Sequence, residues 1–157
     1  MFNLRDAKRE DAPLIFELIK KLAQYEKMEN EVLTSPEELE KQLFDFSYAN
    51  VIIVEENHTA IGFALYFFNF STFVGKPGLY LEDLYIEPEH RNKGYGKKVL
   101  KELAQRAKNQ GCGRMEWSVL KWNSPSIAFY KSLGAAAMDE WDVYRLTQSQ
   151  IEDLAKI

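Results

Sequence analysis

A mixed fold of the α/β (α+β) class is predicted from three features of this 157-residue chain. Strand and helix patterns follow one another in the order strand, two helices, three strands, helix, strand, helix, strand. A glycine loop, Arg91-x-x-Gly94-x-Gly96, leads from an apolar strand into a helix. The composition, 46% hydrophobic and 28% charged, is typical of a folded globular protein. We therefore expect a single domain over residues 1–157, with a mixed central sheet of about six or seven strands flanked by helices.

The first elements are expected to be a short strand and two helices. Phe2 to Arg5 has strand character, and Asp11-Ala12-Pro13 opens a helix whose apolar residues recur at helical spacing. Ser35-Pro36-Glu37-Glu38 combines an N-cap serine, a proline at the first helical position and a glutamate able to reciprocate the cap. The second helix should therefore run to about Phe46.

Three strands are expected next. Val51 to Glu55 and Ala60 to Phe70 are rich in β-formers and flank Glu56-Asn57-His58-Thr59, which predicts a hairpin. Leu79 to Glu87 is almost continuously apolar apart from one acidic pair, which predicts a central strand covered on both faces.

The remaining chain is expected to alternate helices with strands. An amphipathic pattern, a strand pattern, a Pro-containing helix start, a second strand pattern and a helical tail follow in turn. The helices are expected at Val99 to Gly111, Asn123 to Gly134 and Ile151 to Ile157. The strands are expected at Met115 to Leu120 and Val143 to Leu146.

Charge and cysteine content narrow the function. The net charge of −4 argues against a nucleic-acid partner, which a basic surface would bind, and suits a cationic small molecule. The single cysteine, Cys112, allows neither an internal disulfide nor a cysteine-based metal site, and no metal is expected. Because no signal-peptide core or membrane-length apolar run is present, we expect a cytoplasmic protein without a membrane partner.

The glycine loop predicts an anion site. Glycines leave room for successive N–H groups to point into one concavity at a helix N-terminus, where the helix dipole favours a pyrophosphate. A P-loop is excluded because Gly96 is followed by Lys97-Lys98 without the Ser or Thr that binds magnesium. A Rossmann turn is excluded because Val99 stands where the third glycine would be.

The chain resembles the Gcn5-related N-acetyltransferase (GNAT) superfamily, and within it the diamine (spermidine/spermine) and thialysine acetyltransferase branch. Two motifs carry the resemblance: Arg91-x-x-Gly94-x-Gly96 after a Leu-Tyr-Leu-Glu-Asp strand, and Trp122-Asn123-x-Pro125-Ser126-x-x-Phe129-Tyr130-Lys131. The similarity extends along nearly the whole chain. It implies the GNAT fold, acetyl-CoA as co-substrate, an amine as acceptor and a homodimer.

The resemblance also implies where acetyl-CoA binds. The backbone of one strand segment holds the pantetheine arm, the glycine loop takes the pyrophosphate, and three residues of the helix expected from Asn123 to Gly134 line the thioester end. In that order these are Leu84, Tyr85 and Ile86; Arg91, Asn92, Lys93, Gly94, Tyr95, Gly96 and Lys97; and Asn123, Ser126 and Tyr130.

Glu82 is the candidate general base. A primary amine has a pKa near 10.4, so only about four in ten thousand molecules are uncharged at pH 7, a handicap of about 4.6 kcal/mol. Glu82 and Asp83 are carboxylates in an apolar strand, and alternation sends them to opposite faces. By resemblance Glu82 lies at the reactive centre and accepts the proton through water. The alternative is that Glu82 is only an acceptor in a buried polar pair, and Asp83 is given a structural role.

Tyr130 is the candidate acid. Coenzyme A leaves as a thiolate with a pKa near 8.5, so a hydroxyl donor beside the sulfur lowers the barrier. Tyr130 follows Ser126 by four residues, which puts both on one helix face close to Asn123.

Acidic and aromatic residues are the clues to the acceptor. Glu26, Glu29 and Glu31 cluster after the first helix. With Glu82 they form either an acidic groove for a diamine or polyamine or simply a solvated helix end. Phe73 belongs to a very aromatic run that lines either the substrate channel or a dimer interface. The predicted function is therefore acetyl-CoA-dependent acetylation of a small polyamine, diamine or amino-acid-like amine. A protein or aminoglycoside acetyltransferase and a non-catalytic coenzyme A sensor are the alternatives.

Overall fold

The computed structural model describes all 157 residues, which form two compact units, Met1–Leu120 and Lys121–Ile157. The larger unit contains a five-stranded sheet in which the strands follow their order along the chain. The first four strands pair antiparallel and the fifth pairs parallel to the fourth. The strands are β1 (Phe2–Asp6), β2 (Asn50–Glu56), β3 (Thr59–Ser71), β4 (Lys76–Ile86) and β5 (Arg114–Trp117).

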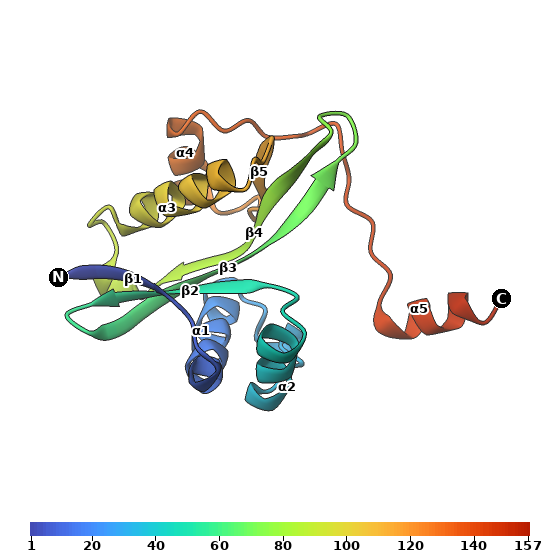
Figure 1. Ribbon diagram of the computed structural model, residues 1–157, viewed down its shortest axis with the longest axis horizontal. Coiled ribbons are helices and arrows are strands. Elements are labelled where there is room, and N and C mark those ends of the chain that lie inside the picture. The colour runs from blue at the N-terminus through green and yellow to red at the C-terminus, as the bar shows by residue number, and fades with distance from the viewer. The chain divides into compact units, whose positions relative to one another are not determined.

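Helices cover both faces of this sheet. In Figure 1, α1 and α2 lie against one face and α3 lies against the other. Short helical turns join these elements to the strands. The helices of the larger unit are η1 (Arg9–Asp11), α1 (Ala12–Tyr25), η2 (Glu29–Glu31), α2 (Pro36–Glu40), η3 (Lys41–Asp45), η4 (Pro88–His90) and α3 (Tyr95–Asn109).

Two apolar layers form the core because neighbouring strand residues point to opposite faces. One layer joins α1 and η3 to alternate residues of the central strands and includes Ile15, Leu18, Leu22, Leu43, Val51, Ile53, Phe63 and Tyr85. The intervening residues Ile52 and Val54 are fully buried on the opposite face, the face of α3. This double burial explains the apolar sequence of the central strands.

Local signals correctly predicted most helix boundaries. Pro13 lies in the first turn of α1, and the Ser35 hydroxyl accepts a hydrogen bond from the backbone N–H of Glu38 at 3.1 Å. The reciprocal contact of Glu38 does not form, because its carboxylate accepts from Gln42 Nε2 at 2.7 Å. The predicted second helix reaches Phe46 through η3, which is a π-helical turn.

The smaller unit contains α4 (Ser124–Ser132) and α5 (Gln148–Ala155). The Asn123 side chain accepts from the backbone N–H of Ser126 at 3.4 Å and caps α4. Gly134, at φ 87°, follows the end of this helix as expected. Thr147 and Gln150 form a reciprocal capping box that starts α5.

The predicted strand at Val143 to Leu146 is wrong, and the sheet has five strands where about six or seven were expected. These four residues are irregular and exposed. β-Forming residues become a strand only when a neighbouring strand pairs with them, and no strand of this chain does so here. The strand expected from Met115 to Leu120 is also shorter, because β5 ends at Trp117.

Candidate active site

Strands β4 and β5 pair over only part of their length, which opens one edge of β4. Their parallel register covers Gly78–Leu81, and the rest of β4, through Ile86, has no strand on that side. Leu84 and Tyr85, two predicted pantetheine contacts, lie in this segment. The backbone groups that face away from β3 there have no strand partner, although the Ile86 carbonyl oxygen accepts a hydrogen bond from Arg91.

A β-bulge lies at the start of the open segment. On β3, Leu65 is opposite Asp83 and the next residue, Tyr66, is opposite Leu81, so Glu82 is the extra residue of β4. Bulges bend a strand and re-aim its side chains. Strict alternation, which the sequence argument applied to Glu82 and Asp83, is therefore interrupted at this point.

Three carboxylates form an acidic cluster beside the bulge: Glu82, Asp83 and Glu26, the C-cap residue of α1. Burial, followed by the charges of Glu82 and Glu26, raises the pKa of Asp83 from its usual 3.8 to about 7. Burial and the charge of Glu82 also raise the pKa of Glu26. Glu82 itself is exposed. The cluster thus combines an exposed carboxylate with a half-buried one, Asp83, whose pKa is raised to about 7.

The glycine loop forms the N-terminus of α3 as predicted. Gly94 is the N-cap of this 15-residue helix at φ 79°, and Asn92 is left-handed as well at φ 63°. A side chain at Gly94 would meet no atom within 4 Å, so space lies open in front of the loop. The first N–H groups of a helix have no intrahelical acceptors, and exposed Lys97 and Lys98 lie in the same turn. These features fit an anionic group such as a pyrophosphate.

Arg91 connects the loop with β4 and α1. Its Nε donates to the carbonyl oxygen of Ile86 at 2.8 Å. Its guanidinium lies 4.8 Å from the ring centroid of Tyr25 and 5.5 Å from that of Tyr85. The Arg91 side chain thus fixes the path of the loop.

Sequence reasoning missed Glu56, the last residue of β2. Its carboxylate accepts hydrogen bonds from the Tyr95 hydroxyl at 2.5 Å and the Lys93 ammonium at 3.2 Å, and lies 3.4 Å from Nδ1 of His90. The hydrogen bond from Tyr95 is the main cause of a Glu56 pKa lowered to about 2. No local motif marks such a residue, because its partners lie more than thirty positions along the chain.

The predicted acid lies on α4, in the smaller unit. Ser126 and Tyr130 are four positions apart on this helix, and Asn123, its N-cap, is buried at 7% exposure. The ring centroids of Phe129 and Tyr130 are 5.6 Å apart. The local arrangement predicted for these residues is therefore present within α4.

Two predicted substrate contacts lie outside the acidic cluster. Phe73 is 92% exposed in the turn between β3 and β4, about 20 Å from Glu82 along the strand. Glu29 begins η2 and is exposed, three residues beyond Glu26.

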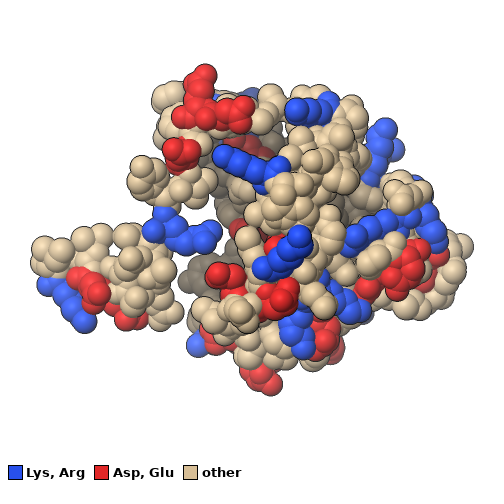
Figure 2. Space-filling model, turned by 180° about the vertical axis from the view of Figure 1, so that it is seen from behind, with Lys and Arg blue, Asp and Glu red and all other residues tan.

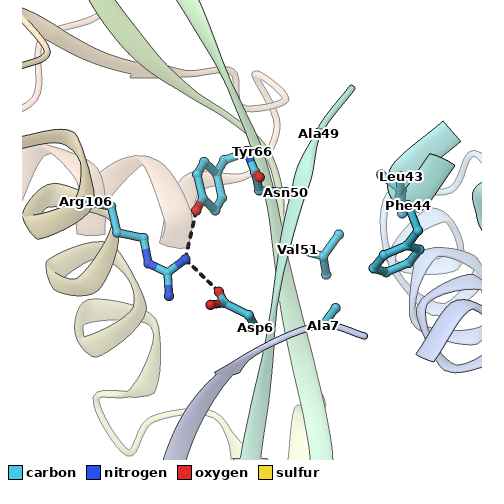
Figure 3. A pocket seen from close by; sticks show the side chains of 9 residues that line it. All are labelled: Asp6, Ala7, Leu43, Phe44, Ala49, Asn50, Val51, Tyr66 and Arg106. Atoms are coloured by element: carbon cyan, nitrogen blue, oxygen red, sulfur yellow. Dashed lines mark hydrogen bonds and ion pairs between the residues drawn. The ribbon is translucent and has the colours of Figure 1, made fainter. Parts of the chain in front are cut away.

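A cavity of about 260 Å³ lies elsewhere in the larger unit and contains none of the predicted site residues. Figure 3 shows Arg106, Tyr66 and Asp6 turned toward one another on one side of β2, with Leu43 and Phe44 on the other. Arg106 donates to Asp6 at 2.7 Å and to the Tyr66 hydroxyl at 2.9 Å. Because these polar groups satisfy one another, this cavity is part of the scaffold.

The surface charges, the possible metal ligands and the helix lengths are further features of the whole molecule. Basic and acidic side chains are interspersed over the face shown in Figure 2. No set of three or more His, Cys, Asp or Glu residues is arranged to hold a metal ion. None of the helices combines the length and apolar character needed to cross a membrane.

Comparisons with known proteins agree with this architecture. The model of the acetyltransferase (GNAT) family matches residues 15–135. The chain is 34% identical over 164 residues to a thialysine N-epsilon-acetyltransferase of Bos taurus, covering 97% of this chain and 96% of that protein. It is 40% identical over 96 residues to L-ornithine N5-acetyltransferase NATA1 of Arabidopsis thaliana, covering 61% of this chain and 42% of that protein.

A solved structure is similar over the whole chain. An integron cassette protein from V. cholerae superposes with a TM-score of 0.81 at 27% identity, covering 99% of this chain and 98% of that one. The chain belongs to the acetyltransferase (GNAT) family, and its mixed α/β fold is the fold of that family. It is an N-acetyltransferase.

Proposed function

We propose that this protein transfers the acetyl group of acetyl-CoA to a primary amine of a small polyamine, diamine or amino-acid-like substrate. The observation that carries the proposal is the acidic cluster of Glu26, Glu82 and Asp83 beside the open edge of β4. Clustered carboxylates attract an ammonium group. Relatives named for acetylating thialysine at N-epsilon and L-ornithine at N5 support an acceptor of this kind.

Acetyl-CoA supplies the acetyl group in activated form, as a thioester. In the proposal the backbone of Leu84 to Ile86 binds the pantetheine arm along the open edge of β4, and the loop from Arg91 to Lys97 binds the pyrophosphate. The left-handed Gly94 and the free N–H groups of the first turn of α3 support the second assignment. Asn123, Ser126 and Tyr130 line the thioester end.

Glu82 attracts the ammonium group of the acceptor and takes its proton, through water. Its exposure and its place on the bulge support this role over that of Asp83, which is only half-exposed and whose pKa is raised to about 7. The uncharged amine then attacks the thioester carbonyl directly. Glu29 remains the predicted outer contact of the acceptor. Phe73, about 20 Å from Glu82 along the strand, fits the alternative prediction, a dimer contact.

Tyr130 donates its hydroxyl proton to the departing sulfur, and the proton that the nitrogen releases as the amide forms restores the hydroxyl. The capped α4 supports this role, because the cap by Asn123 fixes the start of the helix that carries Ser126 and Tyr130. No metal has a part in the mechanism.

We further propose that residues 1–157 act as one acetyltransferase domain, as a homodimer and in the cytoplasm. The family match runs from residue 15 to residue 135 and so includes part of both units. Large apolar side chains are exposed in both units, among them Phe70, Phe73, Trp141 and Tyr144, and a second copy of the chain would cover them.

The function is tested by measuring thiol release from acetyl-CoA with a panel of amines. The panel contains diamines, polyamines, amino acids with a side-chain amine, aminoglycosides and basic peptides. Fastest turnover with the first three supports the proposal. Preference for an aminoglycoside or a peptide would contradict the acceptor class, and coenzyme A binding without turnover on any amine would favour the sensor.

A further inference from the structure

Glu56 joins three parts of the chain around the glycine loop. His90 ends η4, Lys93 lies in the loop, and Tyr95 is the first residue of α3. All three meet the one carboxylate at the end of β2, at 3.4 Å, 3.2 Å and 2.5 Å. A single acceptor thus holds both ends and the middle of the segment 90–95.

This segment needs such support. Asn92 and Gly94 both have left-handed backbone conformations, which an isolated chain adopts only part of the time. Ordering a loop at the moment of binding lowers affinity, so a loop that is held beforehand binds its ligand more tightly. The sheet provides the rigid base, because β2 is paired on both sides.

We propose that Glu56 is a positioning residue for the pyrophosphate of coenzyme A, holding the segment 90–95 in the shape that directs backbone N–H groups at the phosphates. This inference rests on the proposed function, which assigns the pyrophosphate to this loop. It assigns new roles to Lys93 and Tyr95. Their side chains donate hydrogen bonds to Glu56, and the backbone N–H groups of the loop, together with Lys97, bind the anion.

The charges of Glu56 and Lys93 are compatible with a pyrophosphate bound at the loop. A carboxylate beside a pyrophosphate repels it, but the Lys93 ammonium at 3.2 Å offsets the charge of Glu56. Hydrogen bonds from Tyr95, Lys93 and His90 lower the pKa of Glu56 to about 2, so the carboxylate is ionised at neutral pH. The Tyr95 ring also packs against Phe2 of β1, with centroids 4.5 Å apart.

Glu56→Gln tests the proposal because it keeps the size of the side chain and removes its charge. We expect the Kd of coenzyme A and the KM of acetyl-CoA to rise about tenfold, the effect of losing a charged hydrogen bond. Tyr95→Phe removes one donor and should raise both constants about threefold to fivefold. Calorimetric titration with coenzyme A gives the Kd, and thiol release gives the KM.

S-acetylpantetheine separates positioning from general stability. This donor has the thioester and the pantetheine arm without the pyrophosphate, so kcat/KM for it should be the same in Glu56→Gln and the wild type. A variant that merely loosens the fold would lose activity with both donors.

Glu55→Gln is the matched control. Glu55 is the neighbouring residue and its side chain is 14% exposed, against 16% for Glu56. It binds Arg5 at 2.9 Å and Asn3 at 3.1 Å, both on β1, and makes no contact with the loop. Glu55→Gln should lower the melting temperature by a similar amount and leave the Kd of coenzyme A unchanged.

Three outcomes would overturn the inference. Equal Kd values for Glu56→Gln and Glu55→Gln would reduce Glu56 to a structural residue, and tighter binding by Glu56→Gln would show that repulsion outweighs positioning. In both cases the proposed function stands. If the wild type binds no coenzyme A at all, the proposed function fails and the role of Glu56 fails with it.

Discussion

Glu82 and Asp83 are adjacent acidic residues with different surroundings. Glu82 is exposed at the bulge, whereas burial and two neighbouring carboxylates raise the pKa of Asp83 to about 7. A base for an amine must be ionised and accessible, and a buried group near the same site mainly sets the local charge. The two residues therefore predict two different experiments.

Glu82→Gln should reduce kcat/KM at neutral pH about a hundredfold, because proton removal from the amine loses its acceptor. Above neutral pH the free amine increases about tenfold per pH unit, so part of the loss should be recovered. The pH profile of kcat/KM provides the measurement, with exposed Glu37→Gln as control. A loss of the same size at every pH would point to a binding role for Glu82.

Asp83→Asn should stabilise the protein at high pH and not at low pH. The folded state keeps the Asp83 proton up to about pH 7, whereas the usual pKa is 3.8, so wild-type stability falls as pH rises through this window. Asparagine cannot ionise and avoids that loss, by about 2–4 kcal/mol above pH 7. Urea unfolding near pH 4 and near pH 8 measures the difference. Exposed Asp139→Asn should show no such pH dependence. If the stability difference between Asp83→Asn and the wild type were the same at both pH values, the argument would be refuted.

Tyr130→Phe should lower kcat about a hundredfold with little change in the Kd of coenzyme A, because only the proton for the departing sulfur is lost. Steady-state kinetics and calorimetry measure the two quantities. Tyr48, 72% exposed, provides a control in Tyr48→Phe. An unchanged kcat would remove Tyr130 from the mechanism.

At the scale of elements, the close approach of β3 and β4 determines where the open edge of β4 lies. A Cβ at Gly62 would lie 2.2 Å from the carbonyl oxygen of Tyr85, well inside contact distance. Gly62 therefore allows β3 to pair with the segment that is proposed to bind the pantetheine arm.

Gly62→Ala should lower the free energy of unfolding by about 2–3 kcal/mol and raise the KM of acetyl-CoA, because the backbone of Tyr85 must move. Gly75→Ala is the control. Gly75 is left-handed at φ 71° in the turn after β3 and has no atom within 4 Å of an added Cβ. It should cost about 1 kcal/mol through backbone strain and leave the KM unchanged. An unchanged KM in Gly62→Ala would separate this contact from donor binding.

Elements set by local chemistry were predictable from the sequence, and those set by pairing were not. Pro13 with its neighbours and the Asn123 cap fixed two helix starts within a few residues. The bulge at Glu82 depends on the register of β3, and the contacts of Glu56 join segments distant in sequence. Val143 has the composition of a strand residue, but pairing partners are a property of the whole fold. The glycine loop was predictable because its left-handed backbone conformation depends on a residue within the loop, Gly94.

At the scale of the whole molecule, the residues beyond α4 have little core of their own. Trp141 is 72% exposed, Val143 88% and Leu154 56%, and no residue after Asn123 is buried. A short segment of this kind gains stability only from a surface that covers it. In the proposed homodimer a second copy provides that surface.

Light scattering should therefore give a mass of about 36.6 kDa, twice the 18.3 kDa of one chain. The melting temperature should rise with protein concentration, because association stabilises the folded state by mass action. The double variant Val143→Asp with Tyr144→Asp should shift the mass toward that of one chain. A monomeric wild type whose melting temperature does not depend on concentration would contradict the dimer.

Arg91 connects the region proposed to bind the donor with the region proposed to bind the acceptor. Its side chain bridges the glycine loop and Tyr25, and Tyr25 directly precedes Glu26 of the acidic cluster. The glycine loop and the acidic cluster are thus connected through the contact between Arg91 and Tyr25. If donor binding tightens acceptor binding by some factor through this bridge, thermodynamic reciprocity requires the acceptor to tighten donor binding by the same factor.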